Sequence, residues 1–231
     1  MGSTCQGFEA DELRVILEHL RQNSHRQRGD YVLFMTMLSL GGRITEILRL
    51  TWGDVWTFST SQPRRKVTRD KLKVSKNAKI KRITGMLNHE AREAVAEWFE
   101  LCSQRRKVLP RHYVFTRGGR LRPPDRRSVW RIFKSIYAEL GLDTGSDLTT
   151  FALHSARKTF LQMNEQIWFA HYIEKFNVTS GDTAGIRLAV EFAEKQCQLL
   201  LGHSSLDTTR AYKRKPTENP LASIEQAFSG L

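Results

Sequence analysis

The chain has 231 residues, and its 40% hydrophobic content is enough to bury a core in one large domain or two small ones. Lysine and arginine total 37 against 24 acidic residues, which gives a net charge of +13. The composition excludes a disordered chain, and the charge favours a polyanionic partner, most simply a nucleic acid. An anionic membrane would also attract this charge, but the basic residues are spread over several segments and do not form one helix face.

Targeting signals and disulfides are not expected. The longest apolar run, residues 31–40, is too short to span a bilayer, and the N-terminus lacks the pattern of a secretory signal. The three cysteines, Cys5, Cys102 and Cys197, have no CxxC spacing, which favours reduced thiols over a disulfide framework or a zinc site. We therefore expect a cytoplasmic protein.

The N-terminal half begins with helical patterns. Apolar residues at helical spacing predict helices over residues 9–21 and 31–40, and two glycines end the second helix. Arg43 follows this break and opens a short amphipathic helix. Arg43 and Glu46 are three residues apart, so they share the polar side of that helix.

The middle of the chain changes to a β-like pattern. Two short runs at residues 71–74 and 79–84, joined by a turn-like segment, predict a basic hairpin within residues 66–86. Asn88 is suited to cap the next helix. Residues 103–128 are rich in loop signals, with a possible short strand at residues 113–116.

The C-terminal half again favours helices. Four are expected: one from Asp125 or Ser128 to Gly141, one capped by Thr149 or Thr150, one over about residues 183–201, and one from Pro220 to about residue 229. The second carries His154 and Arg157 three residues apart on one face. Residues 166–182 look like a surface excursion. Because the chain has no clear linker or internal repeat, a single domain over residues 1–231 is the default expectation.

Two arginines are candidates for a phosphate clamp. A phosphodiester resists attack because its oxygens are negatively charged and gain more charge in the transition state. The planar guanidinium of arginine donates two parallel hydrogen bonds to a phosphate and stays charged at any working pH. Arg43 and Arg157 are the residues we expect in this role. No residues form an obvious magnesium cluster, so no metal or other cofactor is expected.

The remaining candidates handle protons and the covalent bond. Tyr212 is the candidate nucleophile, although a phenol with a pKa near 10 needs nearby cations or a base. His154 is placed to take or share that proton, and His203 to hydrogen-bond the phosphate. Lys76 on the hairpin is suited to protonate the departing deoxyribose oxygen. The product would be a phosphotyrosine, which lets a second strand's hydroxyl reseal the backbone without ATP.

Each of these residues also has a simpler interpretation. An Arg–Glu pair on a helix is usually a solvated ion pair, and a lone histidine or tyrosine is usually structural. Four hairpin lysines, Lys73, Lys76, Lys79 and Lys81, are alternatives for the same role, and most of them would be plain phosphate contacts. The combination of spacings, rather than any single motif, favours the catalytic interpretation.

Taken together, the motifs resemble the tyrosine recombinases, also called phage integrases. The resemblance rests on Arg43 and Glu46 with LTWGDV, Lys76 in VSKNAKIKR, HSARKTF from His154, and LLGHSSLDTTRAY with His203 and Tyr212. It implies that Arg43, Lys76, His154, Arg157 and His203 surround the scissile phosphate, that Tyr212 is the nucleophile, and that Glu46 is the partner that orients Arg43.

The resemblance also implies an architecture and partners. The family fold is mainly α with a small antiparallel β-sheet, needs no metal, and works as four protomers on two DNA duplexes. In many members a C-terminal helix docks into a neighbouring protomer, a role for residues 220–228. The residues before Phe8 are too few for the N-terminal core-binding domain that members usually carry. The stretch between Arg157 and His203 is longer than usual, which places an insertion at about residues 166–190.

The partner is expected to be double-stranded DNA, and the enzyme a site-specific recombinase associated with the nucleoid. Candidate DNA-backbone contacts are Lys73, Lys79, Lys81, Arg82, Arg122, Arg126 and Arg127. Two alternatives share this fold. One is a nicking-closing enzyme similar to a type IB topoisomerase, and the other is a DNA-binding regulator that has lost cleavage.

Overall fold

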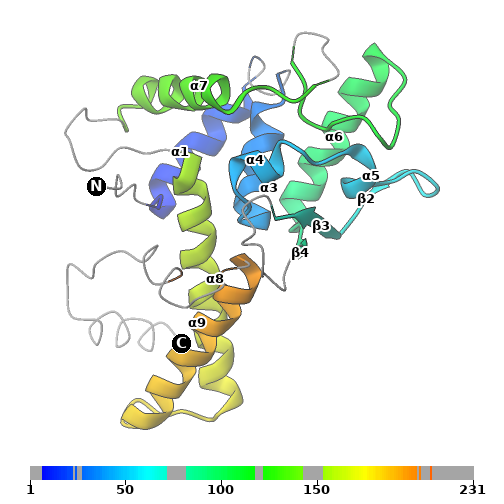
Figure 1. The fold of residues 1–231 in the computed structure, drawn as a ribbon. Helices are drawn as coiled ribbons and strands as arrows, with labels where there is room; N and C mark the ends of the chain where they lie inside the picture. The colour runs from blue at the N-terminus through cyan, green and yellow to red at the C-terminus, as the bar shows by residue number, and fades with distance from the viewer. Residues whose placement is uncertain are drawn as a thin grey trace. The chain divides into compact units, whose positions relative to one another are not determined.

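The structure, a computed structural model, describes residues 7–22, 24, 28–71, 82–117, 122–142, 153–201, 203 and 209. The chain divides into two compact units, Met1–Phe160 and Leu161–Leu231. Helices dominate both, and the described residues include two small antiparallel sheets (Figure 1). The mainly helical fold with a small antiparallel sheet is thereby confirmed, whereas the single catalytic domain stays a prediction.

A buried helix organises the first unit. This helix, α3 (Asp30–Leu40), has apolar side chains on every side, and it packs against α1 (Ala10–Arg21), α4 (Ile44–Ile47) and α6 (His89–Arg105). A helix that is apolar all round is stable in water only when other elements cover it. The two helices predicted over residues 9–21 and 31–40 are confirmed.

A β-hairpin lies beside α4 and α5 (Trp52–Val55) (Figure 1). Its strands, β3 (Lys66–Asp70) and β4 (Arg82–Met86), pair antiparallel from Lys66 opposite Met86 to Asp70 opposite Arg82. The second sheet is a short ribbon of β1 (Trp56–Thr57) and β2 (Gln62–Pro63). The predicted hairpin is confirmed, and its strands reach further from the turn than the predicted runs because Val67 and Ile83 are buried there.

Two helices begin at the predicted caps. The Asn88 side chain accepts a hydrogen bond from the Ala91 backbone N–H at 2.9 Å and starts α6. Asp125 accepts one from the Arg127 N–H at 3.0 Å and starts α7 (Arg126–Glu139). The strand predicted at residues 113–116 is wrong in extent, because this segment makes only a single bridge, from Tyr113 to Thr51.

An aromatic cluster joins distant segments of the first unit. The Phe8 ring lies 5.8 Å from that of Phe34 and 5.6 Å from that of Tyr137, and Phe34 stacks on Phe133 at 5.6 Å. The Phe8 backbone N–H also donates to Thr159 Oγ1 at 2.8 Å. Burial of these rings therefore connects the segment before α1 with α3, α7 and the start of α8 (Leu153–Lys175).

The second unit contains the rest of α8 and α9 (Thr183–Leu201), side by side (Figure 1). The surface excursion predicted at residues 166–182 is wrong for residues 166–175, which continue α8, whereas residues 176–182 form a mostly exposed connection. Tyr172 is buried with its ring 5.4 Å from Phe176 and 5.2 Å from Phe192 of α9, so aromatic packing extends the helix. The helix over 183–201 is confirmed. The insertion at 166–190 stays a prediction, and the expected helix over 220–229 lies outside the described residues.

Candidate active site

Arg43 lies at the junction between α3 and α4. Its backbone N–H donates to Oε2 of Glu46 at 3.0 Å, and its Nη1 donates to Oε1 of the same carboxylate at 3.0 Å. The Glu46 side chain is fully buried, whereas 21% of the Arg43 side chain is exposed. The carboxylate therefore holds the guanidinium in one orientation and leaves part of it open to solvent.

The turn before Arg43 is fitted against α8. Gly41 ends α3 in a left-handed conformation, with φ +58, and a Cβ at this position would lie 2.1 Å from Cδ1 of Phe160. Both observations require glycine. Arg157, three residues before Phe160, donates from Nη1 to the Gly41 carbonyl and is only 1% exposed. Arg157 is thus fixed to the same turn that positions Arg43.

His154 lies beside this pair on α8 and is half-buried. Burial lowers the pKa of His154 below its ordinary value, and the charges of Arg157, Arg126 and Arg43 lower it further. Such a histidine is neutral at neutral pH and can accept a proton or a hydrogen bond. The structure therefore brings Arg43, His154 and Arg157 together within the first unit, while their catalytic roles stay predictions.

A third arginine, missed in the sequence, contacts the same carboxylate. Arg69 of β3 is 2% exposed, and its Nε lies 3.6 Å from Oε2 of Glu46. Burial alternates along β3: Val67 and Arg69 face inward, and their neighbours face outward. This alternation is the feature that could have identified Arg69. The sequence pattern predicts the first strand at residues 71–74, so it does not reveal this register.

The hairpin residues between the strands lie outside the described residues. They include the predicted acid Lys76 and the predicted DNA contacts Lys73, Lys79 and Lys81. Arg82, the first residue of β4, is exposed, and its Nε donates to Asp70 Oδ1 at 3.1 Å. An exposed pair of this kind is weak, so Arg82 can exchange Asp70 for another anion.

His203 belongs to the second unit and is buried. Its Nδ1 lies 2.9 Å from Oγ1 of Thr209, and its backbone N–H donates to the Gln198 carbonyl at 3.0 Å. The Gln198 side-chain amide in turn donates to the His203 carbonyl at 3.2 Å. These bonds fix the histidine after the end of α9. Tyr212 lies outside the described residues.

The remaining predicted DNA contacts lie around the start of α7. Arg122, Arg126 and Arg127 are all exposed. Helix N-termini favour anions because their backbone N–H groups and the helix dipole point outward. The charge of Arg126 also reaches His154, which places this arginine close to the Arg43 and Arg157 group. Contact of these arginines with DNA stays a prediction.

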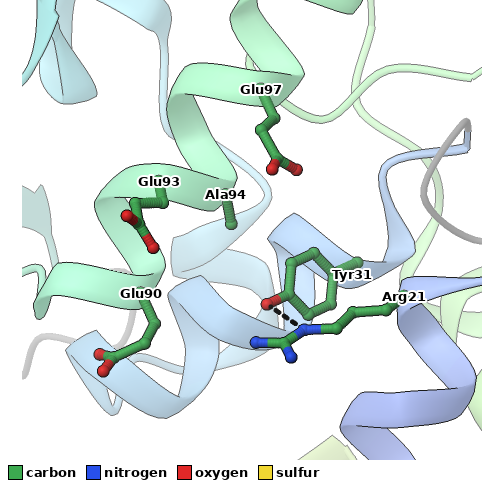
Figure 2. A pocket seen from close by; sticks show the side chains of 6 residues that line it. All are labelled: Arg21, Tyr31, Glu90, Glu93, Ala94 and Glu97. Carbon is green, nitrogen blue, oxygen red and sulfur yellow. Dashed lines mark hydrogen bonds between the residues drawn. The ribbon is translucent and has the colours of Figure 1, made fainter.

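Two cavities in the first unit have different chemistry. One, of about 170 Å³, lies against the Glu46–Arg69 pair, and its lining is Glu46, Arg49, Leu50, Asp54, Thr68, Arg69, Asp70 and Arg82. The other, also of about 170 Å³, contains none of the predicted site residues (Figure 2). There Arg21 Nε donates to the Tyr31 hydroxyl at 3.1 Å, and three glutamates of α6 line the same cavity, so it does not suit a phosphate.

Other sites are not indicated in the ranges that the structure describes. None of those helices has the length and apolar character to cross a membrane, and no three His, Cys, Asp or Glu side chains there are arranged to hold a metal ion. Cys102 and Cys197 are buried, reduced thiols. Burial raises the pKa of Cys102 to about 11, which makes it unreactive.

Comparisons with solved structures identify a common fold. The crystal structure of XerA recombinase has a TM-score of 0.61 and 17% identity, covering 97% of this chain and 64% of that one. A pre-cleavage complex of XerH site-specific recombinase with its difH substrate has a TM-score of 0.58 and 17% identity, covering 99% and 55%. A lambda integrase dimer bound to a COC′ core site has a TM-score of 0.60 and 14% identity, covering 95% and 51%. The chain thus spans less than two thirds of each of these proteins.

Sequence comparison gives the family. A search of curated proteins found no match. The model of the phage integrase family, however, matches residues 6–176, which is most of the chain and includes Arg43, His154 and Arg157. The chain therefore belongs to the phage integrase family, the tyrosine recombinases.

Proposed function

We propose that this protein is a site-specific recombinase that breaks and rejoins DNA strands through a covalent 3′-phosphotyrosine at Tyr212. The observation that carries the proposal is the fixation of two guanidinium groups on one turn. Glu46 accepts a hydrogen bond from Arg43 at 3.0 Å, and Arg157 donates one to the carbonyl of Gly41. Gly41 lies two residues before Arg43 in the chain. A pair of arginines fixed in this way suits an anion with several oxygens.

Preorganised cations are what phosphoryl transfer needs. The scissile phosphate carries one negative charge, and the transition state carries more charge on its equatorial oxygens. Arg43 and Arg157 would donate hydrogen bonds to these oxygens, and their fixed orientation avoids reorganisation during the reaction. The neutral His154 beside them would accept or share the Tyr212 proton, and His203 would hydrogen-bond the phosphate.

The covalent step exchanges one bond to phosphorus for another and moves two protons. The Tyr212 oxygen forms a bond to phosphorus and gives its proton to His154, while the bond from phosphorus to the 5′ oxygen breaks. That oxygen takes a proton from Lys76 and leaves as a 5′ hydroxyl. When the 5′ hydroxyl of another strand attacks the phosphotyrosine, the same steps run in reverse and release Tyr212. No outside energy source is required.

The proposed partner is double-stranded DNA, and the chain's charge of +13 favours it. Structural neighbours include complexes of XerH with its substrate and of lambda integrase with a core site. We further propose that four copies assemble on two duplexes, assisted by residues 220–228, and that Arg122, Arg126 and Arg127 contact the backbone. Such a protein would work in the cytoplasm, at the nucleoid.

Covalent trapping tests the proposal. The purified protein is incubated with fragmented genomic DNA, denatured, and the DNA that remains attached to protein is sequenced at its ends. We expect protein-linked 3′ ends that gather at one defined sequence. The absence of any protein-linked DNA would overturn the proposed chemistry.

The same preparation separates recombination from the alternatives. A plasmid with two copies of the identified sequence should give recombinant products, whereas a plasmid with none should keep its supercoils. Relaxation that needs no site would favour a nicking-closing enzyme. Binding without any covalent product would favour a regulator.

A further inference from the structure

A buried arginine in a strand needs a structural or functional reason. Arg69 is the fourth residue of β3 and is 2% exposed, with Val67 on the same inward face. Removing a guanidinium from water is costly unless the charge is paired, and apolar residues of similar size often give equal or greater stability. Stability alone therefore does not account for an arginine at this position.

The partner of Arg69 is the carboxylate that also holds Arg43. Arg69 Nε lies 3.6 Å from Oε2 of Glu46. The same oxygen accepts the Arg43 backbone N–H at 3.0 Å, and Oε1 accepts Arg43 Nη1 at 3.0 Å. Glu46 is thus held from two sides, by an arginine of the hairpin and by the arginine that begins α4.

Two glycines provide the space for this guanidinium. A Cβ at Gly42 would lie 2.9 Å from Arg69 Nε, and a Cβ at Gly85 of β4 would lie 3.3 Å from Arg69 Nη1. Neither glycine has a positive φ, so close approach rather than backbone conformation favours them. Arg69 therefore occupies a slot between the residue before Arg43 and the second strand of the hairpin.

Neighbouring charges act on the Arg69 guanidinium. Burial lowers the pKa of Arg69 to about 10, a change that Glu46 opposes and that the charges of Arg157 and Arg43 increase. Arg69 is still protonated at neutral pH. Glu46 thus contacts two of these guanidinium groups, those of Arg43 and Arg69, and Arg157 is close enough for its charge to act on Arg69.

We propose that Arg69 is a positioning residue for strand cleavage: through Glu46 it fixes the guanidinium of Arg43, and it attaches the hairpin that carries Lys76 to the same group. This inference rests on the proposed function. It explains why the arginine enters from the hairpin, because one ion pair then connects the phosphate clamp to strand β3.

The test compares cleavage rates of matched variants. Arg69→Met keeps an unbranched side chain that reaches about as far as Nε, and it removes the guanidinium and its charge. Arg49→Met makes the same change at an exposed arginine that lines the same cavity. Each is measured at saturating protein on a nicked duplex containing the site found by trapping. The covalent complex is followed by denaturing electrophoresis, and DNA affinity is measured separately by anisotropy.

We expect Arg69→Met to reduce the cleavage rate on the order of 10²-fold, because a small misplacement of a catalytic group has effects of this size. Its DNA dissociation constant should change by less than about threefold, since the phosphate contacts that dominate affinity remain. Arg49→Met should cleave at the wild-type rate. In a Glu46→Gln background, Arg69→Met should cause little further loss, because residues acting through one contact are not additive.

Two results would overturn the inference. One is a wild-type cleavage rate per folded molecule for Arg69→Met, and the other is an equal fold loss from Arg69→Met in the wild-type and Glu46→Gln backgrounds. If Arg69→Met does not fold, the comparison is repeated with Arg69→Lys, for which we expect about a tenfold loss that disappears with Glu46→Gln. A wild-type rate for Arg69→Lys would then refute the positioning role. If the wild-type protein itself forms no covalent complex, the proposed function fails first and this inference fails with it.

Discussion

Arg157 donates a hydrogen bond from Nη1 to the backbone carbonyl of Gly41, a residue 116 positions earlier in the chain. Arg43 follows Gly41 by two residues, so this bond couples α8 to the turn that holds the other arginine of the proposed clamp. Arg157 should therefore affect both the stability of the protein and the geometry of the proposed clamp. Substitutions of Arg157 and of Gly41 should separate these two effects.

The first prediction concerns the shape of the Arg157 side chain. Arg157→Lys keeps the charge but cannot bind the Gly41 carbonyl and also donate two parallel hydrogen bonds to a phosphate. We expect its single-turnover cleavage rate to fall by about 10²-fold or more, the usual effect of removing one transition-state donor. The control is Arg14→Lys, at an exposed arginine of α1 that pairs with Asp11. Equal rates for the wild type and Arg157→Lys would contradict the clamp.

The second prediction concerns the turn itself. Gly41→Ala places a Cβ against the Phe160 ring and forces alanine into a left-handed conformation. The conformation costs about 1–2 kcal/mol, and overpacking costs a further 1–3 kcal/mol, roughly. Gly141→Ala isolates the first effect, because Gly141 has φ +68 and no atom near its Cβ position. Denaturant unfolding should show a larger loss for Gly41→Ala, and equal losses would disprove the steric contact.

The third prediction concerns pH. His154 has a pKa below its ordinary 6.5, first because of burial and then because of Arg157. As the pH falls below about 6.5, the unfolded chain takes up the proton before the folded protein does, so the free energy of unfolding decreases. The free energy of unfolding of the wild type, relative to that of His154→Gln, should therefore be constant at neutral pH and decrease in acid. Parallel stability curves down to about pH 5 would show that the environment does not favour neutral His154.

The fourth prediction concerns a buried ion pair outside the site. Asp30, the first residue of α3, is fully buried and accepts a hydrogen bond from Arg117 Nη2. Arg117→Met removes this charged partner and should reduce the free energy of unfolding by about 2 kcal/mol, since hydrogen bonds to charged groups contribute about 1.5–3 kcal/mol. Thermal unfolding measures the loss. Arg105→Met, at the end of α6, is the comparison, and equal stability of the two variants would show that the ion pair contributes nothing.

Local patterns in the sequence were enough to predict most helices. The helix predicted over residues 183–201 has the bounds of α9, and side-chain capping gave the starts of α6 and α7 at Asn88 and Asp125. The continuation of α8 was missed because it depends on aromatic packing between Tyr172 and Phe192, which are 20 residues apart and meet only in the folded unit.

In the candidate site, too, some residues follow from local sequence patterns and others depend on tertiary contacts. Arg43, His154 and Arg157 were predicted from their motif spacing, and the structure places them together. Arg69 could not be found in this way, because an arginine in a strand usually faces solvent. Its burial depends on Glu46 of another element and on space at Gly42 and Gly85, which are tertiary features.

The covalent bond at Tyr212 is the central claim, and one measurement tests it most directly. Wild type, Tyr212→Phe and the matched control Tyr113→Phe are incubated with the nicked duplex, and protein-linked DNA is quantified on a denaturing gel. Wild type and Tyr113→Phe should form equal amounts of covalent complex, while Tyr212→Phe forms none and binds DNA with similar affinity, because only the nucleophilic oxygen is removed. Undiminished covalent complex in Tyr212→Phe would contradict the account.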